Sequence, residues 1–138
     1  MFAAHHCALS VADLAASVGF YELLGFRVGH RWAAGDGSLE IVHLVLGGFV
    51  LELFAYADNA GAAPLELAVG NDLRALGVKH LALRVDSLEE ARRELVARGV
   101  DPGAIGPDTP GRTGLDYFFV RDPDGIWVEV VRDERGLS

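Results

Sequence analysis

The sequence predicts an α+β fold built from two βαβββ half-modules. Two observations support this prediction: an internal repeat, and the same order of strand-like and helix-like patterns after each start of the repeat. The chain has 138 residues and is 51% hydrophobic, which is enough apolar material for one domain with its own core. We therefore expect a single domain, residues 1–138, made of half-modules 5–56 and 78–132.

The repeat relates two pairs of segments. Residues 6–14 (HCALSVADL) align with residues 80–88 (HLALRVDSL) at a constant offset of 74 positions. Residues 48–53 (GFVLEL) align with residues 125–130 (GIWVEV) at an offset of 77 positions. The two offsets differ by three, which indicates one short insertion in the second copy. Because histidine, glycine and glutamate recur in the same order, the chain is predicted to be a duplicated module.

The first copy is predicted to contain one helix and four strands. Residues 5–11 alternate in polarity as a strand does, and a helical pattern follows at residues 15–24. Asp13 is the expected N-cap of this helix, and Gly25 is expected just after its end. Gly47 and Gly48 form a tight turn between the last two strands. The remaining strands are expected at residues 26–32, 41–46 and 49–56.

The second copy follows the same order. Residues 79–85 are the expected first strand, Ser87 and Glu90 form a capping-box pattern, and Gly99 follows a helix at 89–98. Strands are expected at 115–120 and 126–131, joined by a turn at 121–125. Residues 57–77 are the expected linker. The stretch 101–114 contains three prolines and is expected to be a mobile loop.

Composition excludes several classes of partner. Twelve Lys and Arg against twenty Asp and Glu give a net charge of −8, which disfavours nucleic acid and anionic membrane surfaces. The uncharged run 41–51 is too short to span a bilayer, and the N-terminus lacks the pattern of a signal peptide. The single cysteine, Cys7, cannot form an internal disulfide. We expect a cytoplasmic protein that binds neither nucleic acid nor membrane.

Four residues with metal-binding side chains recur in the repeat. Each copy places a histidine on the first strand, beside a small alanine, and a glutamate within an apolar last strand. A buried carboxylate is costly unless a partner compensates it, and two imidazoles with two carboxylates can share one divalent cation. Nitrogen and oxygen donors without thiolates suit Ni, Zn, Co, Fe or Mn. The predicted ligands are His6, Glu52, His80 and Glu129.

Less specific interpretations remain open for each of these residues. A single strand histidine is often exposed or satisfied within a core, and Glu52 also suits a solvated strand. His5 competes with its neighbour His6, although the repeat aligns His6 with His80. His30 and His43 have no counterpart in the other copy and are expected to be surface or core residues. Phe54 and Trp127 are candidate substrate contacts or ordinary core residues, and Arg84 is a candidate contact for an anionic group.

These residues lie in segments that resemble the vicinal oxygen chelate superfamily, which includes glyoxalase I, bleomycin-resistance proteins and extradiol dioxygenases. The similarity covers residues 6–28, 47–54, 80–99 and 118–131, and the segment 119–129 (FVRDPDGIWVE) is highly typical. The resemblance implies paired βαβββ modules whose curved mixed sheet surrounds a metal. The superfamily hosts several reactions, so membership alone does not choose one.

The resemblance also implies a function and an assembly. Glyoxalase I-like members use His, Glu, His and Glu in chain order, as here, which favours a lyase or isomerase acting on a small substrate with vicinal oxygens. A dioxygenase would use His6, His80 and Glu129 for Fe(II), and a metal-free binder of hydrophobic compounds would use none. The general base is expected at Glu129, with Glu52 as the pseudo-symmetric alternative. We expect a homodimer, with the metal site built either within one chain or across two.

Overall fold

The chain contains two compact units, Met1–Pro64 and Leu65–Ser138. A computed structural model describes residues 3–61, 76–102 and 113–136. No helix in these described ranges is long and apolar enough to cross a membrane.

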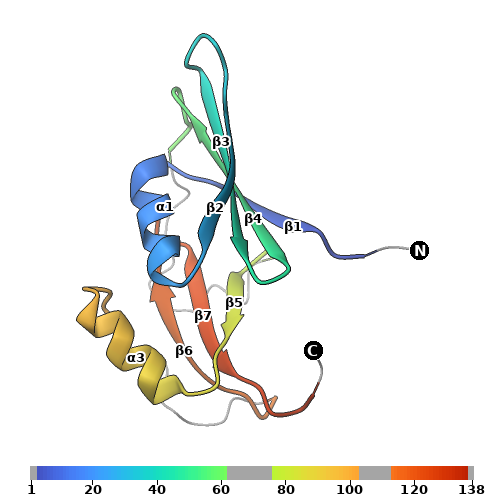
Figure 1. Cartoon of the computed structure of the whole chain (residues 1–138), viewed down its shortest axis with the longest axis vertical. Coiled ribbons are helices and arrows are strands. Elements are labelled where there is room, and N and C mark those ends of the chain that lie inside the picture. Colours follow the sequence, from blue (N-terminus) through green and yellow to red (C-terminus); the bar gives the residue numbers. More distant parts are fainter. Residues whose placement is uncertain (1–2, 62–75, 103–112, 137–138) are drawn as a thin grey trace. The chain divides into compact units, whose positions relative to one another are not determined.

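The first unit is a mixed four-stranded sheet with one helix on its face (Figure 1). The sheet has the order β1-β4-β3-β2, in which β1 and β4 are parallel and the other neighbours are antiparallel. This is the βαβββ order that the sequence predicts. The elements are β1 (His6–Ser10), α1 (Leu14–Leu23), β2 (Arg27–Ala33), β3 (Leu39–Leu46) and β4 (Phe49–Tyr56).

The core of the first unit lies between α1 and one face of this sheet. Val42, Leu44, Leu51 and Leu53 are fully buried, as is Tyr21 on α1. Because side chains alternate along a strand, Glu52 between Leu51 and Leu53 points to the opposite face. The packing of apolar residues onto α1 therefore determines which face carries the polar residues.

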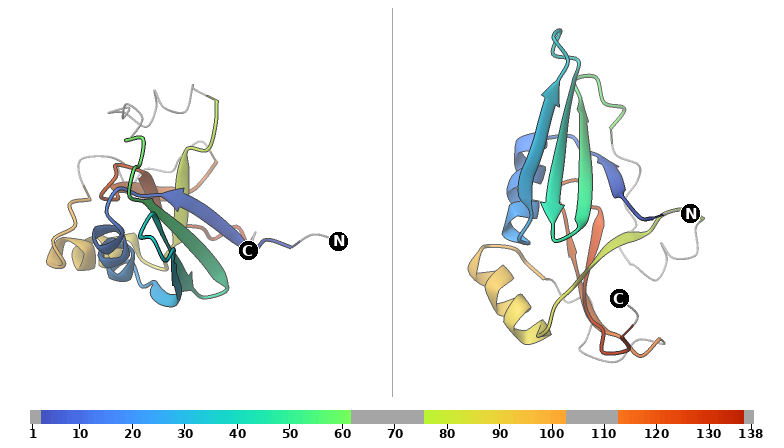
Figure 2. Two further views of the ribbon diagram at one scale, coloured as in Figure 1. Left: turned by 90° about the horizontal axis from the view of Figure 1, so that it is seen from above. Right: turned by 45° about the vertical axis from the view of Figure 1, so that its right-hand side comes forward.

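The second unit repeats this plan with a smaller sheet (Figure 2). Its sheet has the order β5-β7-β6, with β5 and β7 parallel and β6 antiparallel to β7. The repeat predicts three strands after the helix, and the described residues, which omit 103–112, contain two of them. Most of the predicted linker (57–77) and of the predicted mobile loop (101–114) also lies outside the described residues. The elements are β5 (His80–Arg84), α3 (Leu88–Ala97), β6 (Asp116–Arg121) and β7 (Trp127–Arg132).

Both helices begin and end as the sequence predicts. The Asp13 carboxylate accepts a hydrogen bond from the Ala16 backbone N–H at 3.0 Å, and the Ser87 hydroxyl accepts one from the Glu90 N–H at 3.2 Å. Each bond satisfies a backbone donor that the first helical turn leaves unpaired. The residue after each helix C-cap has positive φ, which favours glycine. These residues are Gly25 (φ 95°) and Gly99 (φ 81°).

Candidate metal centre

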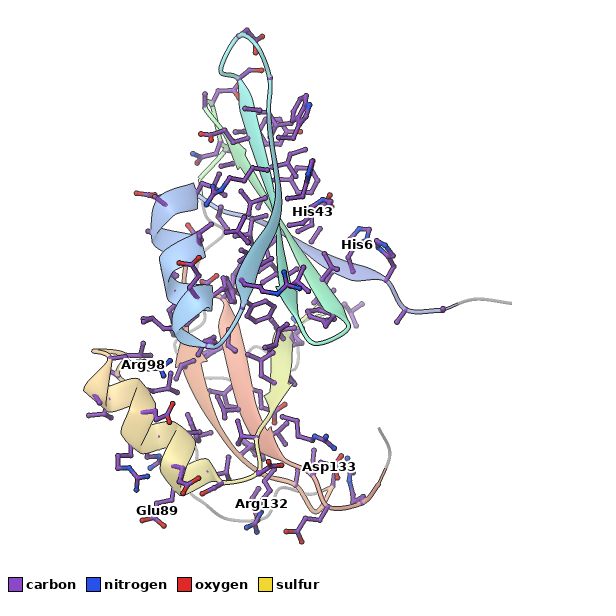
Figure 3. All side chains as sticks on the ribbon, in the orientation of Figure 1. His6, His43, Glu89, Arg98, Arg132 and Asp133 are labelled. Carbon is purple, nitrogen blue, oxygen red and sulfur yellow. The ribbon has the colours of Figure 1, made fainter. Side chains whose placement is uncertain are left out.

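The first half-site is centred on Glu52 of β4. In the sheet register Glu52 lies opposite His43 of β3 on one side and Ala8 of β1 on the other, with His6 two positions before Ala8. The His43 Nε2 lies 2.8 Å from Glu52 Oε1, and the His6 Nε2 lies 3.5 Å from Glu52 Oε2. Figure 3 shows His6 and His43 on the side of the sheet away from α1. Both carboxylate oxygens of Glu52 therefore face an imidazole.

Two further histidines contact this pair of imidazoles. The Nδ1 atoms of His5 and His6 are 2.8 Å apart, so one ring donates a hydrogen bond to the other. The ring of His30 lies 5.7 Å from the ring of His43, centroid to centroid. The contact of His5 with the Nδ1 of His6 resembles the outer hydrogen bonds that orient metal-binding histidines.

The second half-site is centred on Glu129 of β7. Glu129 lies opposite Phe119 of β6 and Ala82 of β5, and His80 stands two positions before Ala82. The His80 Nε2 lies 3.2 Å from Glu129 Oε2. The Glu129 side chain is 12% exposed, and this burial raises the pKa of its carboxyl, an effect that the nearby His80 partly offsets.

Aromatic side chains line the face of the second sheet that carries Glu129. The Phe119 ring packs edge-on against His80 at 5.3 Å and against Trp127 at 5.8 Å, and Tyr117 contacts Phe119 at 5.5 Å. The guanidinium carbon of Arg121 lies 3.7 Å from the centroid of the Trp127 ring, a close cation–π contact. His80 is thus held by an apolar ring, and the surroundings of Glu129 contain less water than those of an exposed carboxylate.

The predicted substrate contacts are placed by strand alternation. Phe54 lies two residues after Glu52, and Trp127 lies two residues before Glu129, so each shares a face with its carboxylate. Arg84 is on β5, on the same face as His80. A hydrogen bond from Arg135, with a smaller contribution from the Arg84 charge, lowers the pKa of Asp133 to about 2. Arg84 therefore already lies near a carboxylate.

The imidazole nitrogens and carboxylate oxygens are of the types that bind a divalent cation, and each unit supplies one such pair. Among the residues that the structure describes, no group of three or more His, Cys, Asp or Glu side chains forms a complete metal site. Two ligands bound at right angles to one ion, each at about 2.1 Å, lie about 3 Å apart. The N···O separations of 3.2 and 3.5 Å in the two copies are close to this value.

One buried atom in the second half-site lacks a partner. The Nδ1 of His80 is buried and has no hydrogen-bond partner among the described residues. Leaving such an atom without a partner costs about 1–3 kcal/mol, and unsatisfied buried polar atoms are rare in native proteins. His80 thus has one buried ring nitrogen that the hydrogen bonds of the described residues leave unused.

Comparison with known proteins identifies the family. The model of the glyoxalase/bleomycin resistance protein/dioxygenase superfamily matches residues 3–130. The chain belongs to this superfamily. The resemblance inferred from the sequence is thereby confirmed.

The similarity to individual relatives extends over more than nine-tenths of this chain. Bacillus subtilis YwkD is 33% identical over 128 residues, covering 91% of this chain and 93% of YwkD. A glyoxalase family protein from Enterococcus faecalis is 30% identical, with a TM-score of 0.76, covering 94% of this chain and 96% of that one. The trypanothione-dependent glyoxalase I of Leishmania major is 25% identical, with a TM-score of 0.65, covering 93% and 84%.

Sequence reasoning did not assign a role to His43. The contact could have been found from the Gly47–Gly48 turn, because a two-residue turn fixes the register of its strands. Counting back three positions from Leu46 and forward three from Phe49 places His43 opposite Glu52, as the structure does. The repeat does not reveal this residue, since the second copy has Phe119 in its place.

Proposed function

We propose that the chain is a divalent-metal-dependent lyase or isomerase of the glyoxalase I type. Its substrate is a small molecule with two adjacent oxygens that bind the metal. The observation that supports this most strongly is the recurrence of one imidazole–carboxylate pair in each copy, His6 with Glu52 and His80 with Glu129. Membership of a superfamily whose solved relatives include a glyoxalase I adds independent support.

The proposed ligands of one Ni, Zn, Co, Fe or Mn ion are His6, Glu52, His80 and Glu129. A divalent cation held there would act as a Lewis acid on the substrate oxygens and make an adjacent C–H bond more acidic. Of the chain's own residues, His5 orients the His6 ring through Nδ1, and Phe119 packs against the His80 ring. These outer contacts restrict the directions in which the two imidazoles can point.

Glu129 is the proposed general base. Its carboxylate takes the C–H proton from one oxygen-bearing carbon of the substrate and returns it to the neighbouring carbon, while the hydroxyl proton passes through water from the first oxygen to the second, so that the product is an isomer of the substrate. Burial raises the pKa of Glu129 toward the range in which a carboxylate can both accept and return a proton. Glu52 is less suited to this step, because each of its oxygens faces an imidazole.

The proposed substrate contacts are Phe54, Trp127 and Arg84, each on the face of its strand that carries the ligands. The proposed location is the cytoplasm, in keeping with the net charge of −8 and the single cysteine, and the proposed assembly is a homodimer. Each half-module alone leaves sheet edges exposed, and pairing removes such edges. Pairing within one chain and pairing across two chains both remain open under this proposal.

Metal content and turnover test the proposal together. Protein purified without a histidine tag is expected to contain close to one divalent ion per chain, by elemental analysis. The loaded protein is expected to isomerise a hemithioacetal formed from a small thiol and a 2-oxoaldehyde. Less than about a tenth of one ion per chain, with no uptake of added Ni, Co, Zn, Fe or Mn, would overturn the proposal.

An Fe(II) dioxygenase is the second candidate, because His43 already contacts one oxygen of Glu52. If that contact withdraws Glu52 from the metal, the remaining set is His6, His80 and Glu129, the two-histidine, one-carboxylate set of non-haem iron oxygenases. Catechol-dependent oxygen uptake by the Fe(II)-loaded protein distinguishes this reaction from isomerisation.

A metal-free binding protein for a hydrophobic compound is the third candidate. The aromatic residues beside Glu129 make this face of the sheet apolar, and Tyr117 is the one of them that is partly exposed, whereas Phe119 and Trp127 are buried. Quenching of tryptophan fluorescence by a hydrophobic compound in the presence of a chelator, with no metal bound, would support this function over the first two.

A further inference from the structure

In the strand register, the two carboxylates of the repeat have matching partners on the parallel strand and different partners on the antiparallel strand. In each copy the first strand supplies a histidine and, two residues later, an alanine directly opposite the glutamate. The antiparallel neighbour differs: it is His43 opposite Glu52, and Phe119 opposite Glu129. The duplicated half-sites therefore differ in the cross-strand residue that lies directly opposite the carboxylate.

His43 acts directly on the Glu52 carboxylate. An ionised carboxylate can only accept hydrogen bonds, so at 2.8 Å the His43 Nε2 carries the proton and donates to Glu52 Oε1. Glu52 Oε2 is the oxygen that faces His6. With a partner on each oxygen, rotation of the carboxylate about its last bond would break a short hydrogen bond.

Phe119, at the matching place in the second copy, gives no hydrogen bond to the carboxylate of Glu129. A phenyl ring has no polar hydrogen to donate, and this one packs against His80 instead of the carboxylate. Among the described residues, His80 is the side chain that hydrogen-bonds Glu129 or acts on its charge. Glu129 can therefore rotate at a lower cost than Glu52.

We propose that His43 is a positioning residue that fixes the Glu52 carboxylate as a metal ligand and so makes the two half-sites unequal. The inference rests on the proposed function, since it assumes that Glu52 binds the ion. His43 acts by donating to one oxygen of Glu52 and leaving the other for the metal. Outer hydrogen-bond partners of this kind contribute about 10- to 100-fold to metal affinity.

Three variants separate positioning from other roles of His43. His43→Phe installs the residue that the second copy has at this place, His43→Gln keeps an N–H donor, and His30→Phe is the matched control on the same face. His30 contacts the ring of His43, and no contact with Glu52 is recorded among the described residues. Far-UV circular dichroism checks that each variant is folded.

Co(II) affinity and the visible spectrum of bound Co(II) are the readouts. His43→Phe is expected to weaken Co(II) binding about 10- to 100-fold and to change the spectrum. His43→Gln is expected to recover most of the affinity, and His30→Phe to bind like the wild type. Unchanged binding by His43→Phe would overturn the proposal. Equal and complete loss in His43→Phe and His43→Gln would also overturn it, because His43 would then be a direct ligand.

A metal-free measurement keeps this inference distinct from the proposed function. In the presence of a chelator and at one fixed pH, the imidazole ¹⁵N signals of His43 are expected to change when Glu52→Gln is introduced, while those of His80 stay the same. If wild-type protein binds no Co(II), the proposed function fails, and these signals alone decide whether His43 orients Glu52. His43 signals that ignore Glu52→Gln would refute the positioning role.

Discussion

Glu52 and Glu129 occupy the same place in the repeat, but their surroundings differ. Glu52 lies between two imidazoles, whereas Glu129 lies beside one imidazole and an aromatic cluster. Burial raises the pKa of Glu129, which makes its carboxylate a better proton acceptor near neutral pH. The comparison teaches that a duplicated site can keep its donor atoms while its neighbours give them different electrostatic environments.

The two helices that support these carboxylates differ in a similar way. In α1 one face is deeply buried, with Ser17, Val18 and Tyr21 in the core. In α3 the buried residues are Leu88 and Leu95, and charged side chains cover much of the rest. Arg92 of α3 lies over the Phe118 ring at 5.0 Å. The repeat has therefore kept strand register and caps while the packing behind each sheet has changed.

The largest expected effect comes from Glu129→Gln, which tests the task assigned to the second copy. Removal of a general base is expected to lower turnover by about 100-fold or more, while the amide oxygen still occupies the ligand position. Turnover and metal content are measured on the same sample. Glu94→Gln, on the exposed side of α3, controls for the loss of one carboxylate. Full turnover with full metal content in Glu129→Gln would show that Glu129 is not the base.

Glu52→Gln tests the task assigned to the first copy. If Glu52 is a fixed ligand, the loss of its charge is expected to weaken metal binding by about 10- to 100-fold or more, with a smaller effect on turnover at saturating metal. Isothermal titration with Zn or Co measures the affinity. Catechol-dependent oxygen uptake that survives this change would instead favour the three-ligand dioxygenase.

The sequence predicts most of the fold because its signals are local. Asp13 and Ser87 cap their helices as expected, Gly25 and Gly99 have positive φ, and the bounds of the described strands differ from the expected ones by at most two residues. The superfamily was also recognisable from the repeat and from residues 119–129, and the family match confirms it. These features depend on residues that are near one another in the chain.

The part of the candidate site that sequence reasoning missed depends on pairing between strands. His43 is nine positions from Glu52, and its contact follows from the hairpin register and not from the repeat. By contrast, the apolar neighbours of Glu129 in the sequence already indicate the burial that raises the pKa of its carboxyl. That the two half-sites combine into one centre stays a prediction, because it depends on pairing between two compact units and not on the residues within either one.

Complementation between two inactive chains tests whether a metal site is built from the first half-module of one subunit and the second half-module of the other. His6→Ala damages the first half-site, and Glu129→Ala damages the second. If sites form across a homodimer, random mixing of the two chains is expected to restore about a quarter of wild-type turnover, since half of the dimers are mixed and each has one intact site. Light scattering confirms the dimer. If every site lies within one chain, the mixture remains as inactive as its parts.

The smallest expected effect is a change in how stability depends on pH, and it tests the environment of Glu129 without any substrate. Burial raises the pKa of Glu129 above its ordinary value of 4.5, so the folded chain keeps this proton to higher pH than the unfolded chain does. Between those two pKa values the folded state binds more protons, and the free energy of unfolding therefore falls as the pH rises through that window.

Glu129→Gln has no proton to lose and removes this slope. In the presence of a chelator, urea denaturation at pH 4.5 and pH 7 is expected to show the variant gaining stability relative to the wild type as the pH rises, while Glu94→Gln shows no such gain. Saturating metal should reverse the sign in the wild type, because a bound cation favours the ionised carboxylate and stabilises the folded state more at higher pH. A Glu129→Gln variant that tracks the wild type at both pH values without metal would mean that Glu129 is as well solvated as an exposed carboxylate, and the proposed difference between the two copies would lose its electrostatic basis.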